Sequence, residues 1–242
     1  MEEINGKWTL HGIDWHDPAC LHNIGELSDL IEEIGFMPFF ECSIPGFSVE
    51  ERTDPDYWWA GDPAADPWEW RAQIAREGKI VYGRFFNKKT GFISKKWFPY
   101  FANLRRDGYD FDSLWDDEKA GVRQKKIMDL FDDKTGLFSY EIKDKAGFGK
   151  GGLKNFDGTI TSLQMQTYLC MRDFQKRRNK QGVEYGWDVA VYSTPEHIYG
   201  YKHVTKAYGE SPRESYERIA KQLRKHFKDA DEKAVKKLIN GV

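Results

Sequence analysis

Four side chains able to bind a metal ion gather near the N-terminus, and they are His11, His16, Cys20 and His22. They fall within twelve residues, beside two aspartates. Imidazole and thiolate groups are ligands that suit Zn²⁺. Their spacing matches no zinc finger or zinc ribbon, and the segment precedes the first predicted helix as a loop. We therefore expect a polar loop with no metal and no cofactor, and metal binding is the alternative.

A glycine-rich stretch could present backbone amides to a phosphate group. It runs from Gly147 to Gly152 and contains Lys150. Amides of this kind ahead of a helix can hold a phosphate. The stretch lacks the Gly-Lys-Ser/Thr of a nucleotide-binding P-loop and does not clearly follow a strand. We interpret it as a flexible connection, and the alternative is that Lys150 contacts a DNA backbone.

A dense basic segment further along the chain could also contact phosphate groups. Its cations are Arg172, Lys176, Arg177, Arg178 and Lys180. They lie at the tip of a predicted hairpin whose loop is Asn179-Lys180-Gln181-Gly182. Such side chains would neutralise phosphates and make DNA binding dependent on salt. The alternative is a solvated loop with no partner.

Hydrolytic chemistry has no support in the sequence. It contains no Gly-x-Ser-x-Gly, no His-Glu-x-x-His and no Cys–His pair. His197 and His203 have no nucleophile beside them in the sequence.

A dense aromatic cluster, Tyr57, Trp58, Trp59, Trp68 and Trp70, stands in the acidic first part of the chain. Such rings could stack on an unpaired base. We expect them to be anchors of the core, because Asp-Pro pairs that favour helix starts flank them.

Three helices and a hairpin must position the basic segment. We predict helices over residues 117–132, 137–146 and 157–167, followed by the hairpin over 168–192. This order is that of a winged helix-turn-helix, whose third helix lies in a DNA major groove while the wing touches the backbone. The inward side chains of the first helix would be Val122, Ile127, Leu130 and Phe131. The exposed side chains of the third helix would include Thr161, Ser162, Gln164 and Gln166.

The first half follows a similar order. Residues 1–22 are expected to be irregular, and a helix follows over 24–34. Further helices begin at Asp54-Pro55 and Asp66-Pro67, and a hairpin turns at Asn87-Lys88-Lys89-Thr90-Gly91. The two halves together predict an α+β fold, mainly helical, built from tandem winged-helix-like units with β-hairpin wings.

Charge divides the chain in the same way. Residues 1–70 hold sixteen acids and two bases, a balance of −14, and the remainder holds 35 bases and 23 acids. We divide the chain into an acidic, aromatic-rich unit over 1–110, a winged-helix-like unit over 111–200 and basic helices over 201–242. The asymmetry indicates either an anionic partner or two lobes that attract each other.

Composition bounds the location of the protein. No run of about 18 apolar residues exists, so we expect no membrane contact. Three scattered cysteines and the lack of a signal-peptide pattern favour the cytoplasm.

Two stretches carry a resemblance to a known family. They are Tyr82 to Lys89 (YGRFFNKK) and Arg105 to Asp112 (RRDGYDFD). Tyr100-Phe101-Ala102-Asn103, Gln164-Met165-Gln166-Thr167-Tyr168 and Tyr185-Gly186-Trp187 extend it over most of residues 24–200. In these segments the chain resembles a set of bacterial proteins labelled AlkZ-related.

The resemblance implies a fold and an activity. The namesake AlkZ/YcaQ-type DNA glycosylases consist of tandem winged helices and release alkylated bases and interstrand crosslinks. Their catalytic signature is Gln-x-Gln or Gln-x-Asp near the N-terminus, and Gln164-Met165-Gln166 matches it in letters. By this resemblance one glutamine would orient the attacking water and the other would stabilise it.

Three functions stay open at the level of sequence. The chain is a DNA-binding protein without catalysis, a DNA glycosylase, or an interaction module whose basic face docks on an acidic partner. DNA is the expected partner, and a homodimer is a further expectation.

Overall fold

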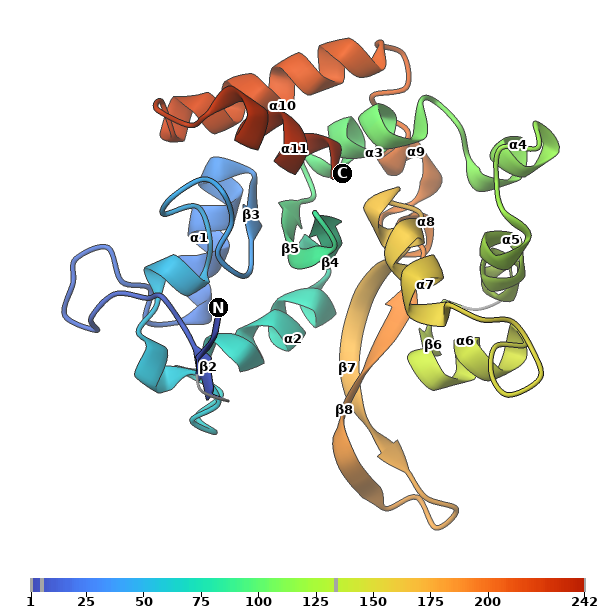
Figure 1. Ribbon diagram of the computed structural model, residues 1–242, viewed down its shortest axis with the longest axis horizontal. Helices are drawn as coiled ribbons and strands as arrows, with labels where there is room; N and C mark the ends of the chain where they lie inside the picture. The colour runs from blue at the N-terminus through green and yellow to red at the C-terminus, as the bar shows by residue number, and fades with distance from the viewer. Residues whose placement is uncertain (1, 5–6, 133–134, 242) are drawn as a thin grey trace.

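The computed structural model describes residues 2–4, 7–132 and 135–241, and its centre is a six-stranded antiparallel sheet (Figure 1). The strands run in the order β3 (Phe36–Pro38), β5 (Lys89–Ser94), β4 (Ile80–Phe86), β7 (Cys170–Arg178), β8 (Glu184–Ser193) and β6 (Leu137–Phe138). The α+β class expected from the sequence is therefore confirmed. No helix of the described residues is long and apolar enough to cross a membrane.

The sheet joins two hairpins, one from each half of the chain. β4 and β5 form the first hairpin, β7 and β8 form the second, and Tyr82 pairs with Met171 where they meet. In the first half the short strand β3 comes before the helix α2 (Pro67–Glu77) and pairs with β5, the second strand of the hairpin. In the second half the short strand β6 comes before the helix α7 (Phe156–Met165) and pairs with β8. Buried side chains from both halves belong to one continuous core.

The helices of the first half begin and end where their sequence signals predict. α1 (Ile24–Ile34) starts after Asn23, whose side chain accepts from the Glu26 amide, and ends at Gly35, with φ 100°. α2 (Pro67–Glu77) starts after Asp66, which caps the Trp68 amide. Two single 3₁₀ turns, η1 (Glu50–Arg52) and η2 (Pro55–Tyr57), lie between them.

Two expectations about the first half were wrong. Residues 1–22 are not wholly irregular, because β1 (Glu2–Ile4) pairs with β2 (Lys7–Thr9). The first hairpin turns on Asn87 and Lys88 alone, both at positive φ, and Gly91 already lies within β5. A side chain at Gly91 would meet the Phe86 ring at 2.5 Å, so this glycine serves packing rather than the turn.

The second half corrects the expected helix boundaries. The helix predicted over 117–132 begins only at Val122, as α5 (Val122–Met128) followed by the 3₁₀ turn η3 (Asp129–Phe131), and a separate short helix, α4 (Phe111–Asp116), precedes it. Glu118 separates α4 from α5 with φ 58°, and Val122, expected inside, is 59% exposed at the first turn of α5. The helix predicted over 137–146 begins with strand β6 and continues as α6 (Ser139–Lys145). The third is α7 (Phe156–Met165).

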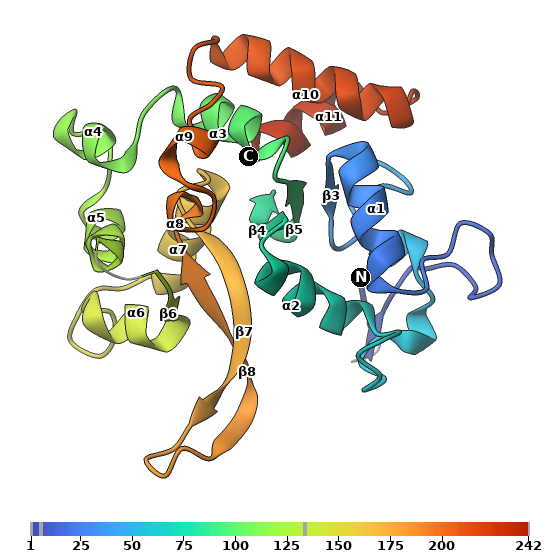
Figure 2. The same cartoon turned by 180° about the vertical axis from the view of Figure 1, so that it is seen from behind.

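The remaining helices gather at one end of the sheet. α3 (Phe98–Arg106) follows β5, while α8 (Pro195–Tyr199) and α9 (Tyr201–Val204) follow β8. α10 (Pro212–His226) and α11 (Glu232–Asn240) return to lie beside α3, as both views show (Figures 1 and 2). Ser211 and Glu214 form a capping box that fixes the start of α10.

Candidate functional site

Gln164, the first glutamine of the motif, lies in the core. Its side chain is fully buried, donates to the Ile160 carbonyl at 3.1 Å and accepts from the Arg84 amide at 3.1 Å. The expected exposure of Gln164 and Thr161 was wrong, because this side of α7 packs on β4. Gln164 therefore joins the third helix of the second half to the hairpin of the first.

Gln166, the second glutamine, faces a different neighbour. Its Oε1 accepts from Gln124 Nε2 on α5 at 3.2 Å, and its Nε2 donates to Ser162 at 3.3 Å. The half-buried side chain lines a cavity of about 390 Å³ together with Arg105 and Asn240. The two glutamines thus point to different sides of α7.

Arg105 holds two helix ends beside this cavity. Its guanidinium donates to the Met165 carbonyl at 3.0 Å, at the end of α7, and to the Ile239 carbonyl at 2.9 Å, at the end of α11. Burial lowers the pKa of Arg105 to about 9. Carbonyls at helix C-termini carry partial negative charge and are suitable partners for a cation.

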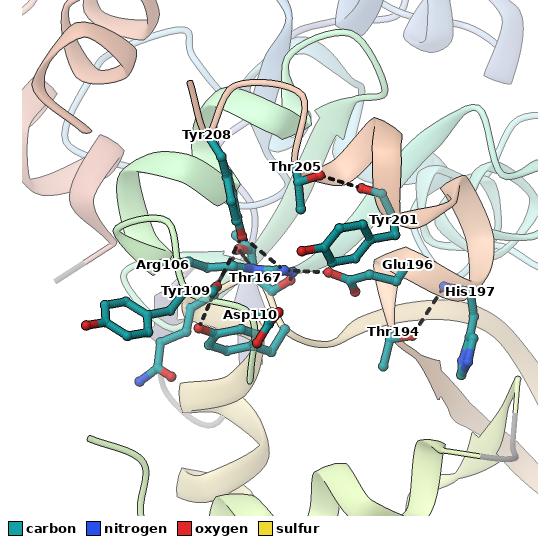
Figure 3. Close-up of polar contacts among 12 residues, drawn as sticks. Arg106, Tyr109, Asp110, Thr167, Thr194, Glu196, His197, Tyr201, Thr205 and Tyr208 are labelled. Carbon is teal, nitrogen blue, oxygen red and sulfur yellow. Dashed lines mark hydrogen bonds and ion pairs between the residues drawn. The ribbon is translucent and has the colours of Figure 1, made fainter. Parts of the chain in front are cut away.

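The residue after the motif is held in a strained conformation. Thr167 has φ 67°, which is unusual for a β-branched residue, and its side chain is buried. Arg106 of α3 donates to Thr167 Oγ1 at 3.0 Å and to the Thr167 carbonyl (Figure 3). The turn after α7 is therefore fixed from a distant part of the chain.

Arg106 itself belongs to a partly buried ion pair, in which its own side chain is 1% exposed and that of Glu196 is 24% exposed. Its Nη1 lies 2.5 Å from Glu196 Oε1 (Figure 3). Its guanidinium lies over the Tyr168 ring, 4.4 Å from the ring centre. Burial, the largest single influence, lowers the pKa of Arg106, but the charge and hydrogen bond of Glu196 together with the nearby tyrosines outweigh burial, so the pKa is raised. The network ties α3, the end of α7 and α8 into one unit.

An acidic cavity of about 260 Å³ adjoins the Arg106 network. Its carboxylates are Asp110, Asp112, Asp129, Asp132 and Glu196, and its ring side chains include Phe111, Tyr168 and Tyr201. Its five carboxylates make the cavity favour a cationic ligand over a phosphate group.

The basic segment lies on an arm that projects from the body. β7 and β8 extend well beyond the other strands, and residues 175–188 are all exposed (Figures 1 and 2). We call residues 170–193 the β7–β8 arm. The acidic first part of the chain does not cover its outer half, so the expected attraction between the two lobes does not occlude these cations.

The five predicted cations of the arm differ in the contacts that each makes within the protein. Arg172 donates to the Thr135 carbonyl at 2.8 Å, and Arg178 pairs with Glu184 at 2.9 Å. Arg177 lies over the Tyr140 ring at 4.8 Å. Lys176 and Lys180 are exposed, and among the described residues no carboxylate lies within 4 Å of either ammonium group. These two lysines are the best placed to meet a phosphate.

Sequence reasoning missed the exposed apolar side chains of the arm. Trp187 is 92% exposed, Val183 60% and Tyr185 51%. Their alternation along β8 is the usual signal of a half-buried strand, so the sequence alone does not distinguish them from core residues. Isolated exposed aliphatic residues are common, but a bare tryptophan on a basic arm indicates a contact surface.

The glycine-rich loop uses most of its own amides. The Gly149 amide donates to the Leu153 carbonyl at 3.2 Å, and the Gly152 amide donates to the Gly149 carbonyl at 3.1 Å. Lys150 projects into solvent. The loop therefore offers a single cation rather than a ready cradle for phosphate.

The N-terminal histidines and cysteine are spread over separate contacts. His22 lies 3.2 Å from Glu26 and 2.8 Å from the Trp15 carbonyl, while His11 lies 3.0 Å from Glu41. Cys20 is buried and His16 is exposed. Within the residues that the structure describes, no group of three or more His, Cys, Asp or Glu side chains is arranged so that it could hold a metal ion.

The aromatic cluster is divided between core and surface. Trp58 and Trp70 are buried, Tyr57 and Trp68 are partly buried, and Trp59 is 48% exposed. Most of its rings therefore anchor the first half, as expected.

Comparison with known proteins gives one result. A family described as AlkZ related matches residues 21–240, which is most of the chain. No curated protein and no solved structure matched.

Proposed function

The chain belongs to the AlkZ-related family, and from this premise we propose that it binds duplex DNA through its β7–β8 arm. The observation that carries the proposal is the arm itself, which presents Lys176, Lys180 and Trp187 to solvent. Cations neutralise phosphates, while an aromatic ring can lie in a groove or against a base.

We also propose that the two halves are tandem winged-helix-like units. In the first half β3, ahead of α2, pairs with β5, the last strand of the hairpin. In the second half β6, ahead of α7, pairs with β8 in the same way. A winged helix has this pairing of its first and last strands. The first unit would occupy residues 1–110 and the second 111–200, with basic helices over 201–242. In this interpretation the arm is the extended wing of the second unit.

The third helix of the second unit is a poor reader of bases. Of α7, only Asp157 and Gly158 in the first turn are exposed. Sequence-specific contact needs donors and acceptors that reach base edges. We therefore assign DNA contact to the arm, with Arg172, Arg177, Arg178 and Lys150 as further candidates, and expect little sequence preference.

The first test is the salt dependence of duplex binding. We expect the logarithm of the affinity to fall linearly with the logarithm of salt concentration, by about 0.9 for each phosphate contacted. Fluorescence anisotropy with a labelled duplex measures this slope. Absence of binding at low salt would contradict the proposal.

A second candidate function is a DNA glycosylase acting on alkylated or crosslinked bases. Gln166 favours it, because this member of the Gln-x-Gln motif lines a cavity. If the activity exists, alkylated DNA releases base in the presence of the protein, and Gln166→Ala reduces the rate by at least tenfold. The matched control is Gln73→Ala, an amide on α2 far along the chain from the motif. Equal release by both variants would exclude Gln166 as a catalytic residue.

A further inference from the structure

A second basic surface lies at the opposite end of the molecule from the arm. Two cavities of about 380 and 340 Å³ share Lys96 and Tyr100 at the start of α3. We call them together the α3/α10 groove. Helices α3 and α10 lie along one end of the sheet in both views, while the arm extends from the other (Figures 1 and 2).

The cations of the groove come from three separated parts of the chain. They are Lys96 before α3, Lys206 after α9, and Arg218, Lys221 and Lys225 on α10. On α10, residues 218, 221 and 225 recur at a spacing that places them on one face of the helix. Their convergence concentrates positive charge around one recess.

Most of these cations have no acidic partner. Within residues 9–132 and 135–241, no carboxylate lies within 4 Å of the ammonium groups of Lys206, Lys221 or Lys225. Lys96 has an acidic neighbour, because its charge acts on the Glu32 carboxyl of α1. Glu210 lines the groove but is engaged by Arg218 at 2.9 Å and by Ser215 at 2.7 Å. The groove therefore keeps a net positive charge, which favours an anionic ligand.

The floor of the groove is aromatic. The rings of Trp97 and Tyr100 lie 5.5 Å apart, and the Arg218 guanidinium lies 5.7 Å from the centre of the Tyr100 ring. Both rings are partly exposed. A positively charged groove with aromatic rings at its base is the arrangement that holds single-stranded nucleic acid, because bases stack on the rings while lysines meet the phosphates.

We infer that the α3/α10 groove binds a single strand of nucleic acid, with phosphates on Lys206, Lys221 and Lys225 and a base against Tyr100. A duplex presents phosphates but keeps its base faces covered, so it would use only part of this surface. The inference concerns a surface remote from the arm and does not depend on duplex binding there.

The test compares charge reversals inside and outside the groove in the full chain, with Lys228 of the control lying just after the end of α10. Lys221→Glu with Lys225→Glu removes two groove cations, while Arg224→Glu with Lys228→Glu changes two exposed cations outside it. The probe is a labelled oligonucleotide of about 12 nucleotides, as single-stranded DNA and as single-stranded RNA. We expect the groove variant to lose at least tenfold in affinity, and its salt slope to fall by about 1.4. The control variant should bind like wild type.

An abasic strand separates stacking from charge. Tyr100→Leu keeps an apolar side chain but removes the ring, and should weaken binding of the normal strand by about tenfold. On an abasic strand it should bind as wild type does. Equal binding of groove and control variants, or full competition by poly-glutamate, overturns the inference. If charge reversal of the arm lysines abolishes duplex binding and leaves single-strand binding unchanged, the inference about the groove stands. That result bears only on the proposed function of the arm.

Discussion

At the scale of single residues, the part of the motif region that is most firmly held by contacts is the turn after α7. Thr167 adopts a left-handed conformation that costs of order 1–3 kcal/mol, and it persists because Arg106 holds it. The letters Gln-x-Gln predict nothing about this turn, since Arg106 is distant in sequence. The orientations of Gln164 and Gln166 were likewise unpredictable, because they depend on β4 and α5.

The Arg106 network supplies a prediction about stability. Arg106→Met should lower the free energy of unfolding by about 3–5 kcal/mol, because it removes an almost fully buried guanidinium that bonds Glu196, Thr167 Oγ1 and the Thr167 carbonyl. Arg76→Met is the control, since it breaks the more exposed pair with Asp173 and should cost under about 1 kcal/mol. Urea denaturation measures both, and Glu196→Gln provides a second variant if Arg106→Met does not fold. Equal losses for Arg106→Met and Arg76→Met would show that the Arg106 network does not anchor this region.

At the scale of elements, local sequence signals predicted the helices of the first half better than the helices and strands of the second half. α1 and α2 have capping residues that define their starts, so the sequence was sufficient. The helix expected over 117–132 begins only at Val122, after Glu118 at positive φ, and strand β6 exists only because it pairs with β8. Strand pairing between distant segments cannot be read from local periodicity.

The arm as an element supplies a prediction about Trp187. Trp187→Ala should leave stability within about 0.5 kcal/mol of wild type, because the side chain packs on almost nothing. The same change should weaken duplex binding by about tenfold if the ring enters a groove or stacks on a base. Trp59→Ala, another exposed tryptophan, is the binding control. A Trp187 variant that binds DNA as tightly as wild type would rule out a role for this ring.

At the scale of the whole molecule, a net charge of −2 conceals two basic surfaces. The sequence indicated the asymmetry but could not say whether the acidic part covers the basic part, since that depends on how distant segments pack. In the structure residues 175–188 of the arm are exposed, so the acidic residues 1–70 do not cover its outer half. Balanced total charge is therefore compatible with local attraction to nucleic acid.

The most direct measurement of the central claim is duplex affinity across a salt series for matched charge reversals. Lys176→Glu with Lys180→Glu changes the arm, and Lys233→Glu with Lys236→Glu changes two exposed lysines of α11. We predict that the arm variant loses at least tenfold in affinity and that its salt slope falls by about 1.8, while the α11 variant matches wild type. Equal affinity and equal slope for the arm variant and wild type would contradict DNA binding by the β7–β8 arm.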